Sequence, residues 1–465
     1  MRTSETTLHK TLRQPRPLPL SRATTVALAI TLLSMAPALL GTLASPARAY
    51  GPAEVRAILM QAQNPLPDSV GRVVLATQRS LDLLGNGGIS MEEHTIERAG
   101  PRRPEEFPNP AWYFRPRIDS LLISVATIHR ADGTQEPVPR DSIRREPVEG
   151  AGPGGYPGIQ KLAMHLPPLR SGDALEVHLA GASVPLSRIE QVAGEHLFAD
   201  QDSVVESELI VRFPTVLSMI GWRMGGLPPA ERSTLGGNYE ARWLVGHLPP
   251  SVPTYRTVSG RLTGTAPDSL GPMLLEYGFQ ADWRSVVRPK RIFWRHVLER
   301  SEPEILAGVA REIAQATIDP RERMQRAIAW TDANLKPLSI PAAQLWFEPA
   351  DPDAVVRSGF AIPRDRAAIL VWLLRRLGVR ADAVTVSSRG NPALQLTFPQ
   401  QLDLWTVRAQ AGSDPETWVD LRSGTQQPAS SVPAGPGLLW TVKTEDEDPI
   451  VSFPGLPPLP VTGRP

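Results

Sequence analysis

The stretch RSGFAIPRDRAAILVWLLRRLGVR, residues 357–380, decides the fold of the C-terminal half of this 465-residue chain. Its apolar residues recur at spacings of three and four, and most of the polar residues between them are arginines, a pattern typical of a helix largely enclosed by protein. Pro363 suits the first helical turn, where a missing N–H costs nothing, and Gly378 suits the left-handed position just past the helix. We therefore expect one buried helix between these two residues.

Further helices and strands are expected around this core helix. A helix over 303–317 has Ser301 as its expected N-cap, and a second helix over 320–335 has Asp319 as its cap. The strands expected after the core helix cover 381–387, 394–398, 404–409 and 418–421, with one more at 438–443. The order of helices followed by strands predicts an α+β domain.

The N-terminal half has a different pattern. A short lead-in helix is expected at 52–63. After it, short β-rich runs follow one another about every ten residues, which favours a sandwich or barrel over βαβ units. The expected strands cover 71–82, 89–98, 118–128, 161–166, 174–179, 203–214, 238–245 and 254–263. The Arg-Pro-Lys-Arg run within 287–292 predicts an exposed linker between the two halves.

The core helix resembles that of bacterial transglutaminase-like domains, which have the papain-like cysteine protease fold. In that family an Arg-x-Gly-Asp-Cys-x-Asp pattern leads into a Leu-rich helix ending in Leu-Arg-x-x-Gly. Aligning Asp365, Leu374-Arg375 and Gly378 with this pattern puts Pro363 at the position of the family's cysteine. The resemblance therefore implies the fold without its nucleophile.

The other catalytic positions of the resembled family are also altered. Asp403 stands where the resemblance places the histidine base, and the chain has no histidine after His296. Asp420, in Trp418-Val419-Asp420, matches the orienting aspartate. Two interpretations of Asp420 stay open: a remnant acid that holds Arg364, Arg422 or a ligand, or a strand-end residue that satisfies nearby backbone N–H groups. Ser358 near the helix entrance is a weak alternative nucleophile, because no activating base is evident.

The N-terminal half resembles a second family, a β-rich domain of unknown function that often precedes transglutaminase-like domains in exported bacterial proteins. The matching features are a Val-Ala-Thr-Ile strand that ends in Ala131-Asp132-Gly133, the Leu-Pro-Pro-Leu step at 166–169, the strand at 172–177, and Asp282-Trp283. This family implies no particular chemistry. Together the two resemblances span about 66–425.

The first 49 residues have the pattern of a secretory signal. Basic residues precede an apolar run at 23–43, and Ala47-Arg48-Ala49 offers a cleavage site, so the mature chain would begin near Tyr50. The alternative is an uncleaved membrane anchor, since the run is long enough to span a bilayer. We expect an exported protein, periplasmic or extracellular, whose mature chain does not span the membrane.

The composition excludes several kinds of site. The chain has no cysteine, which excludes disulfides, thiolate metal sites and a cysteine nucleophile. Its 49 basic and 48 acidic residues are interspersed, so we expect no nucleic-acid partner. The histidines after the expected signal segment are well separated in the sequence, which favours solvated or core histidines over metal ligands. They are His94, His129, His165, His178, His196, His247 and His296. We expect no metal and no cofactor, and we interpret the acidic run 444–448 as a solvated turn.

These features together predict an α+β multidomain protein, with an N-terminal all-β sandwich-like region and a C-terminal papain/transglutaminase-like α+β domain. The expected divisions are a signal peptide (1–49), a lead-in helix (50–65), a β-sandwich-like region of one or two subdomains (66–287), a degenerate transglutaminase-like domain (292–425) and a Pro-rich tail (426–465). The function favoured by the sequence is that of a non-catalytic scaffold or binding module of the cell envelope, with a protein, peptide or cell-wall partner. The alternative is an amide-directed hydrolase or transferase with a non-standard residue set.

Overall fold

The computed structural model of the chain shows a mixed, strand-rich α+β fold with several sheets. It describes residues 49–84, 88–116, 118–152, 154–183, 193–200, 202–250, 257–258, 261–262, 273–279, 283–338, 340, 349–386, 402, 404–421, 426–428, 437–440 and 450–451. Almost all of the expected signal segment, and the expected strand 394–398 and acidic turn 444–448, lie outside these residues. No helix within them is long and apolar enough to cross a lipid bilayer.

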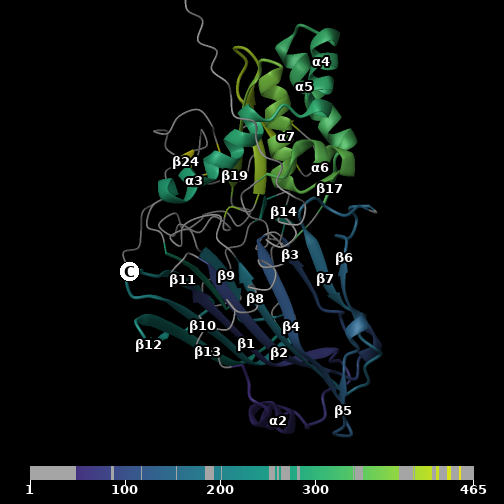
Figure 1. Cartoon of the computed structure of the whole chain (residues 1–465), viewed down its shortest axis with the longest axis vertical. Helices are drawn as coiled ribbons and strands as arrows, with labels where there is room; N and C mark the ends of the chain where they lie inside the picture. Colours follow the sequence, from purple (N-terminus) through teal and green to yellow (C-terminus); the bar gives the residue numbers. More distant parts are fainter. Residues whose placement is uncertain are drawn as a thin grey trace, which may run out of the picture. The chain divides into compact units, whose positions relative to one another are not determined.

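An eight-stranded sheet forms the framework of the N-terminal half (Figure 1). In spatial order its strands are β12 (Glu231–Leu235), β13 (Asn238–Leu248), β10 (Ser203–Pro214), β1 (Arg72–Leu83), β2 (Ile89–Ala99), β8 (Ala174–Ser183), β4 (Asp119–His129) and β5 (Gln135–Pro137). Neighbouring strands are antiparallel except β1 and β10, which pair in parallel. The predicted β1–β2 hairpin is confirmed, and the parallel pair joins the two sets of strands into one sheet.

Two three-stranded sheets cover one face of this framework. One consists of β11 (Ile220–Met224), β16 (Leu274–Gly278) and β9 (Ala193–Leu197), and the other of β3 (Ala111–Phe114), β7 (Gln160–Met164) and β6 (Ile143–Glu146). Each shares a hydrophobic cluster with the large sheet: Leu209 and Trp243 pack with Leu275 in one, and Ile128 and Leu175 pack with Met164 in the other. The short segments β14 (Thr257–Val258) and β15 (Arg261–Leu262) form a separate hairpin.

The opposite face of the large sheet is partly covered by the lead-in helix. This helix, α2 (Pro52–Gln61), buries Val55 against Val73, Leu75 and Ile96 of β1 and β2. The helix expected at 52–63 is therefore confirmed. The described connections include the 3₁₀ turns η1 (Pro104–Glu106) and η2 (Arg140–Ser142).

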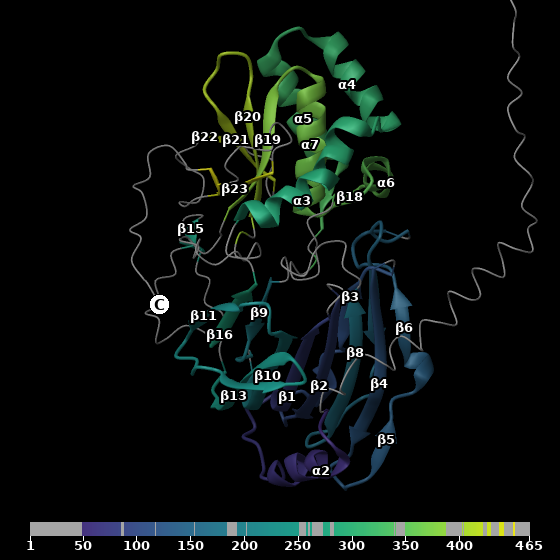
Figure 2. The same ribbon diagram turned by 60° about the vertical axis from the view of Figure 1, so that its left-hand side comes forward.

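The C-terminal half places helices against a six-stranded antiparallel sheet (Figure 2). The helical elements are α3 (Trp283–Arg295), a π-helical turn η4 (His296–Arg300), α4 (Glu304–Ala316), α5 (Pro320–Asn334), α6 (Pro352–Ser358) and α7 (Pro363–Arg376). The sheet order is β22 (Gln426–Pro428), β21 (Thr417–Asp420), β20 (Leu404–Gln410), β19 (Arg380–Val386), β23 (Gly437–Trp440) and β24 (Ile450–Val451). Short strands β17 (Lys336–Pro337) and β18 (Phe360–Ala361) pair just before α7.

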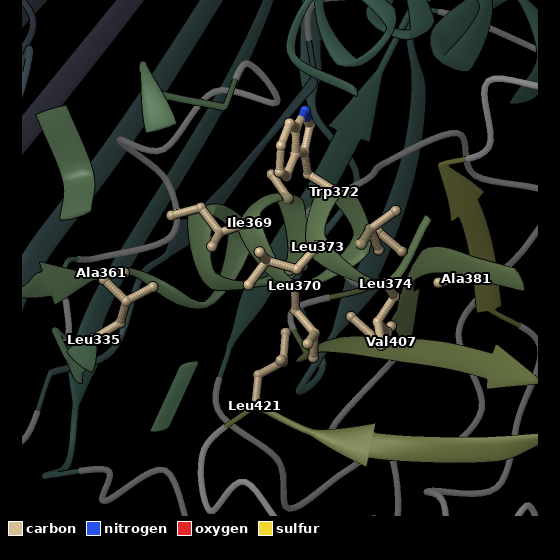
Figure 3. Close-up of a cluster of buried hydrophobic side chains, with 14 of the residues drawn as sticks. Leu335, Ala361, Ile369, Leu370, Trp372, Leu373, Leu374, Ala381, Val407 and Leu421 are labelled. Carbon is tan, nitrogen blue, oxygen red and sulfur yellow. The ribbon is translucent and has the colours of Figure 1, made fainter. Parts of the chain in front are cut away.

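Helix α7 is the predicted core helix, and the structure confirms it. Every residue from Arg364 to Leu374 is buried, since β19 and β20 pack on one side of the helix and α5 on another. Figure 3 shows Leu370 pointing toward Leu421 and Leu374 toward Val407, and Leu335 belongs to the same cluster. Gly378 has a φ of 80°, the left-handed conformation expected at the end of the helix.

Two local predictions were wrong. Ser301 does not cap α4: the helix begins at Glu304, and the Ser301 hydroxyl donates to the Val297 carbonyl at 2.6 Å. The expected linker 287–292 lies inside α3, where Val287 and Arg291 are buried. Asp319 was predicted correctly, because its carboxylate accepts a hydrogen bond from the Arg321 N–H at 3.0 Å and caps α5.

The hydrophobic core around α7 includes a loop from the N-terminal half. Val148, Ala151, Tyr156 and Ile159 are buried in the same cluster as the α7 leucines. The predicted strands at 161–166 and 174–179 are present, but β7 and β8 do not pair with each other. They belong to different sheets, and the chain before β7 passes through the α7 core.

Candidate functional site

The start of α7 is where the family resemblance places a nucleophile. Pro363 is the first residue of the helix, and Ile362 before it provides no side-chain cap. Proline has no N–H and no reactive side chain, so this position can neither attack a carbonyl nor donate to an anion. What surrounds it is a set of buried charges on the next three residues, Arg364, Asp365 and Arg366.

Asp365 is the acceptor at the centre of these charges. Its carboxylate accepts hydrogen bonds from Arg364 Nε at 2.8 Å, from the Ala350 N–H at 3.1 Å and from the Tyr156 hydroxyl. Burial, together with the Asp365 charge, raises the pKa of Tyr156 well above its ordinary value. The hydroxyl therefore stays protonated and donates a hydrogen bond to the carboxylate. A residue of the N-terminal half thereby contacts the first turn of α7.

Arg366 connects the same turn to the neighbouring elements. Its guanidinium donates to the Asp332 carboxylate on α5 and to the Leu421 carbonyl just after β21. Burial lowers the pKa of Arg366, while the charges of Asp332 and Asp420 oppose that shift. Asp420 thus exerts an electrostatic effect on Arg366, an arginine that neither interpretation of Asp420 names, and both interpretations stay predictions.

The structure places two of the three predicted site positions. Pro363 starts α7, and Asp420 ends β21, paired in register with Thr406 on β20. Asp403 lies outside the described residues, so the arrangement of all three together stays a prediction. Ser358 hydrogen bonds to nearby backbone, because its hydroxyl lies 2.7 Å from the Val355 carbonyl and 3.0 Å from the Phe360 carbonyl.

Aromatic side chains pack around the same core. Trp405 on β20 stacks on Trp294 of α3, with ring centroids 5.4 Å apart and planes 15° apart. Trp405 and Phe360 are both half-buried against the α7 cluster. Two cavities within the described residues, of about 210 and 410 Å³, are lined entirely by residues of the N-terminal half. One lies under α2, and the other lies beside β12.

The large sheet contains a histidine cluster that the sequence did not reveal. Glu176 on β8 accepts from His94 Nε2 on β2 at 3.0 Å and lies 2.7 Å from His129 Nε2 on β4. Burial alone would raise the pKa of Glu176, but the hydrogen bonds from the two histidines outweigh it and lower the pKa to about 2. Only the pairing of distant strands brings these residues together.

The cluster continues along β8. The ring centroid of His94 lies 5.2 Å from that of His178 and 5.3 Å from that of Tyr50. The Tyr50 hydroxyl donates to Glu206 on β10 at 3.1 Å. Within the described residues, no group of three or more side chains has a geometry that could hold a metal ion.

Comparisons with known proteins inform the fold alone. No protein-family model and no curated protein matches the chain. Among solved structures, the chain is similar to "a putative protease" from Parabacteroides distasonis, with 14% identity, coverage of 77% of this chain and 71% of that chain, and a TM-score of 0.59. An M1 zinc metallopeptidase from Deinococcus radiodurans is 12% identical over 45% of this chain and 42% of that one. Its TM-score of 0.23 is too low to indicate a shared fold.

Proposed function

We propose that residues 292–425 are a degenerate transglutaminase-like domain, and that the protein is exported and acts through this domain as a scaffold or binding module of the cell envelope. The observation that carries the proposal is the identity of the residues that stand at the start of α7. Pro363 stands at the expected thiol position, and the charged groups after it bond to the protein itself.

The arrangement of elements supports the same proposal. A buried helix is followed by the antiparallel strands β19, β20 and β21, and Asp420 ends the last of these. This is the order that the resemblance implies. A papain-like reaction needs a thiolate and a histidine base in reach of one another. Here the chain contains no cysteine, and its last histidine is His296.

The direct test is an assay for amide chemistry. Full-length mature protein would be incubated with a fluorescent amine and a glutamine-containing acceptor, and separately with muropeptides analysed by mass spectrometry. We expect no turnover above the buffer blank. Turnover by the wild type that disappears in Asp420→Ala would contradict the proposal. Asp414→Ala, which removes a more exposed aspartate, serves as the matched control.

An alternative function is amide hydrolysis by a non-standard residue set. The name of the Parabacteroides structure makes proteolysis the first reaction to examine. Cleavage of a peptide library by the wild type and by Asp420→Ala separates the two cases. If the wild type and Asp420→Ala both cleave the library only at the background rate, the result favours the binding module.

Export is part of the proposal and is tested separately. The N-terminal sequence of protein recovered from the producing cells should begin near Tyr50. Tyr50 already contacts Glu206 and the His94 ring, so a chain that starts there keeps α2 docked on the sheet. An intact N-terminus in the membrane fraction would favour an anchor instead.

A further inference from the structure

A serine on the large sheet has the surroundings of a nucleophile. Ser124 lies on β4 at the point where the register against β8 shifts: Ile123 pairs with Leu179, and Val125 pairs with His178. Ser124 is therefore the extra residue of a β-bulge, a feature that re-aims a side chain. It is exposed, and its Oγ lies 2.7 Å from His178 Nδ1 and 3.2 Å from the His178 backbone carbonyl, to which the hydroxyl can also donate.

The surroundings of His178 favour the tautomer that can act as a base. Its other nitrogen, Nε2, is buried without a hydrogen-bond partner and lies 3.6 Å from the Glu92 carboxylate. That negative charge favours the proton on Nε2, which leaves a lone pair on Nδ1 to accept the proton of Ser124. In the opposite tautomer, the buried lone pair of His178 Nε2 would face the Glu92 carboxylate, which is unfavourable.

The imidazole of His178 is also held in place. Its ring lies 5.2 Å from that of His94, which is hydrogen-bonded to Glu176, and Glu176 is bonded in turn to His129. Three groups from three strands therefore support the base on which Ser124 depends. This rigid support is what a general base needs to keep its nitrogen on the nucleophile.

An exposed apolar side chain lies two residues before Ser124 on β4. Leu122 pairs with Ala180 on the same face of the sheet, and Leu122 is 64% exposed. Leu122 therefore presents an exposed apolar side chain on the same strand as Ser124. An open sheet face of this kind suits esters with a good leaving group rather than amides, whose amine must be protonated as it departs.

We propose that Ser124 is a nucleophilic serine activated by His178, with Glu92 as a positioning residue, and that it accepts acyl groups from activated esters. Ser124 Oγ attacks the carbonyl carbon while its proton passes to His178 Nδ1. The ester C–O bond then breaks, and the alcohol leaves with that proton. Water attacks the acyl-serine in the same way, which releases the acid and restores the hydroxyl. No residue of α7 takes part, so this site and the proposed function can fail independently.

The test uses the full-length mature protein with a fluorophosphonate probe and with p-nitrophenyl acetate. We expect one adduct, mapped to Ser124 by peptide mass spectrometry, and no adduct in Ser124→Ala. Labelling in His178→Gln should be about a hundredfold slower or more, the gain typical of a general base.

Ser120→Ala is the matched control. Ser120 lies on the same strand and is exposed, and its hydroxyl donates to the Ala182 carbonyl at 3.4 Å. This variant should label at the wild-type rate, and Glu92→Gln should label several-fold more slowly with an unchanged melting temperature. The proposal is overturned if His178→Gln labels as fast as the wild type while folded, or if the adduct maps to another residue.

Discussion

Single buried carboxylates organise the polar interactions of both halves. Glu176 joins two histidines across three strands, and Asp365 joins Tyr156 to the first turn of α7. From the sequence, Asp365 could be assigned to the start of a helix because helix signals are local. Glu176 could not be assigned to any cluster, since His94 is 82 residues away from it and only the strand register brings them together.

Replacing Glu176 should change the acid sensitivity of the protein. The pKa of this carboxyl, about 2, lies below the ordinary 4.5, so its stabilisation is complete above about pH 4.5 and is lost as the pH falls toward 2. Glu176→Gln should lower the free energy of unfolding by about 2 kcal/mol at pH 7. Urea titrations at several pH values would measure this difference, which should shrink in acid. The exposed Glu231→Gln should show neither effect, and a constant difference down to pH 2 would contradict the assignment.

The contact between Tyr156 and Asp365 can be measured with a double-mutant cycle. Tyr156→Phe removes one donor and should cost about 1 kcal/mol, because the other donors to Asp365 stay in place. Asp365→Asn leaves the buried Arg364 without its carboxylate and should cost about 3 kcal/mol or more. A coupling energy near zero between the two substitutions would show that the hydroxyl and the carboxylate do not interact.

At the scale of elements, the sequence predicted best where the signal is local. Helix α7 and its terminal Gly378 follow from apolar spacing and turn chemistry, and α5 follows from Asp319 and Pro320. Helix α3 was missed because Pro289 and its basic neighbours are typical of a linker. Its helical conformation depends instead on burial of Val287 and Trp294 in the α7 core, which is a tertiary effect.

Truncating the buried face of α7 should be costly. Leu370 is 1% exposed within the cluster of Figure 3, so Leu370→Ala should lower the free energy of unfolding by about 2–5 kcal/mol. Arg376→Ala on the same helix removes a half-exposed ion pair with Glu302 and should cost less than about 1 kcal/mol. Thermal melts of the two variants compare these values directly. If both substitutions lower the free energy of unfolding by the same amount, Leu370 is not buried in the core as the structure has it.

At the scale of the whole molecule, the β region supplies part of the C-terminal core. The loop that carries Val148, Ala151 and Tyr156 is buried in the same cluster as α7, and Val287 of α3 joins it there. Sequence composition indicated two halves with a linker between them. It could not show this shared core, because the contribution of a loop to a distant core leaves no periodic pattern.

This shared core predicts that the fragment 292–425 does not fold alone. Without the loop at 148–159, the α7 cluster loses several buried side chains and the donor to Asp365. The isolated fragment should show poorly dispersed amide NMR signals and no cooperative melting transition, whereas the mature chain should melt cooperatively. A well-folded fragment with a sharp transition would contradict the shared core.

The central claim is that the entrance of α7 no longer performs amide chemistry. The most direct measurement is the incorporation of a fluorescent amine into a glutamine-containing protein, with the mature wild-type chain compared to Pro363→Ala and Asp420→Ala. All three should match the buffer blank, because no thiol and no histidine base are present at the site. Incorporation by the wild type that is abolished by either substitution would contradict the account.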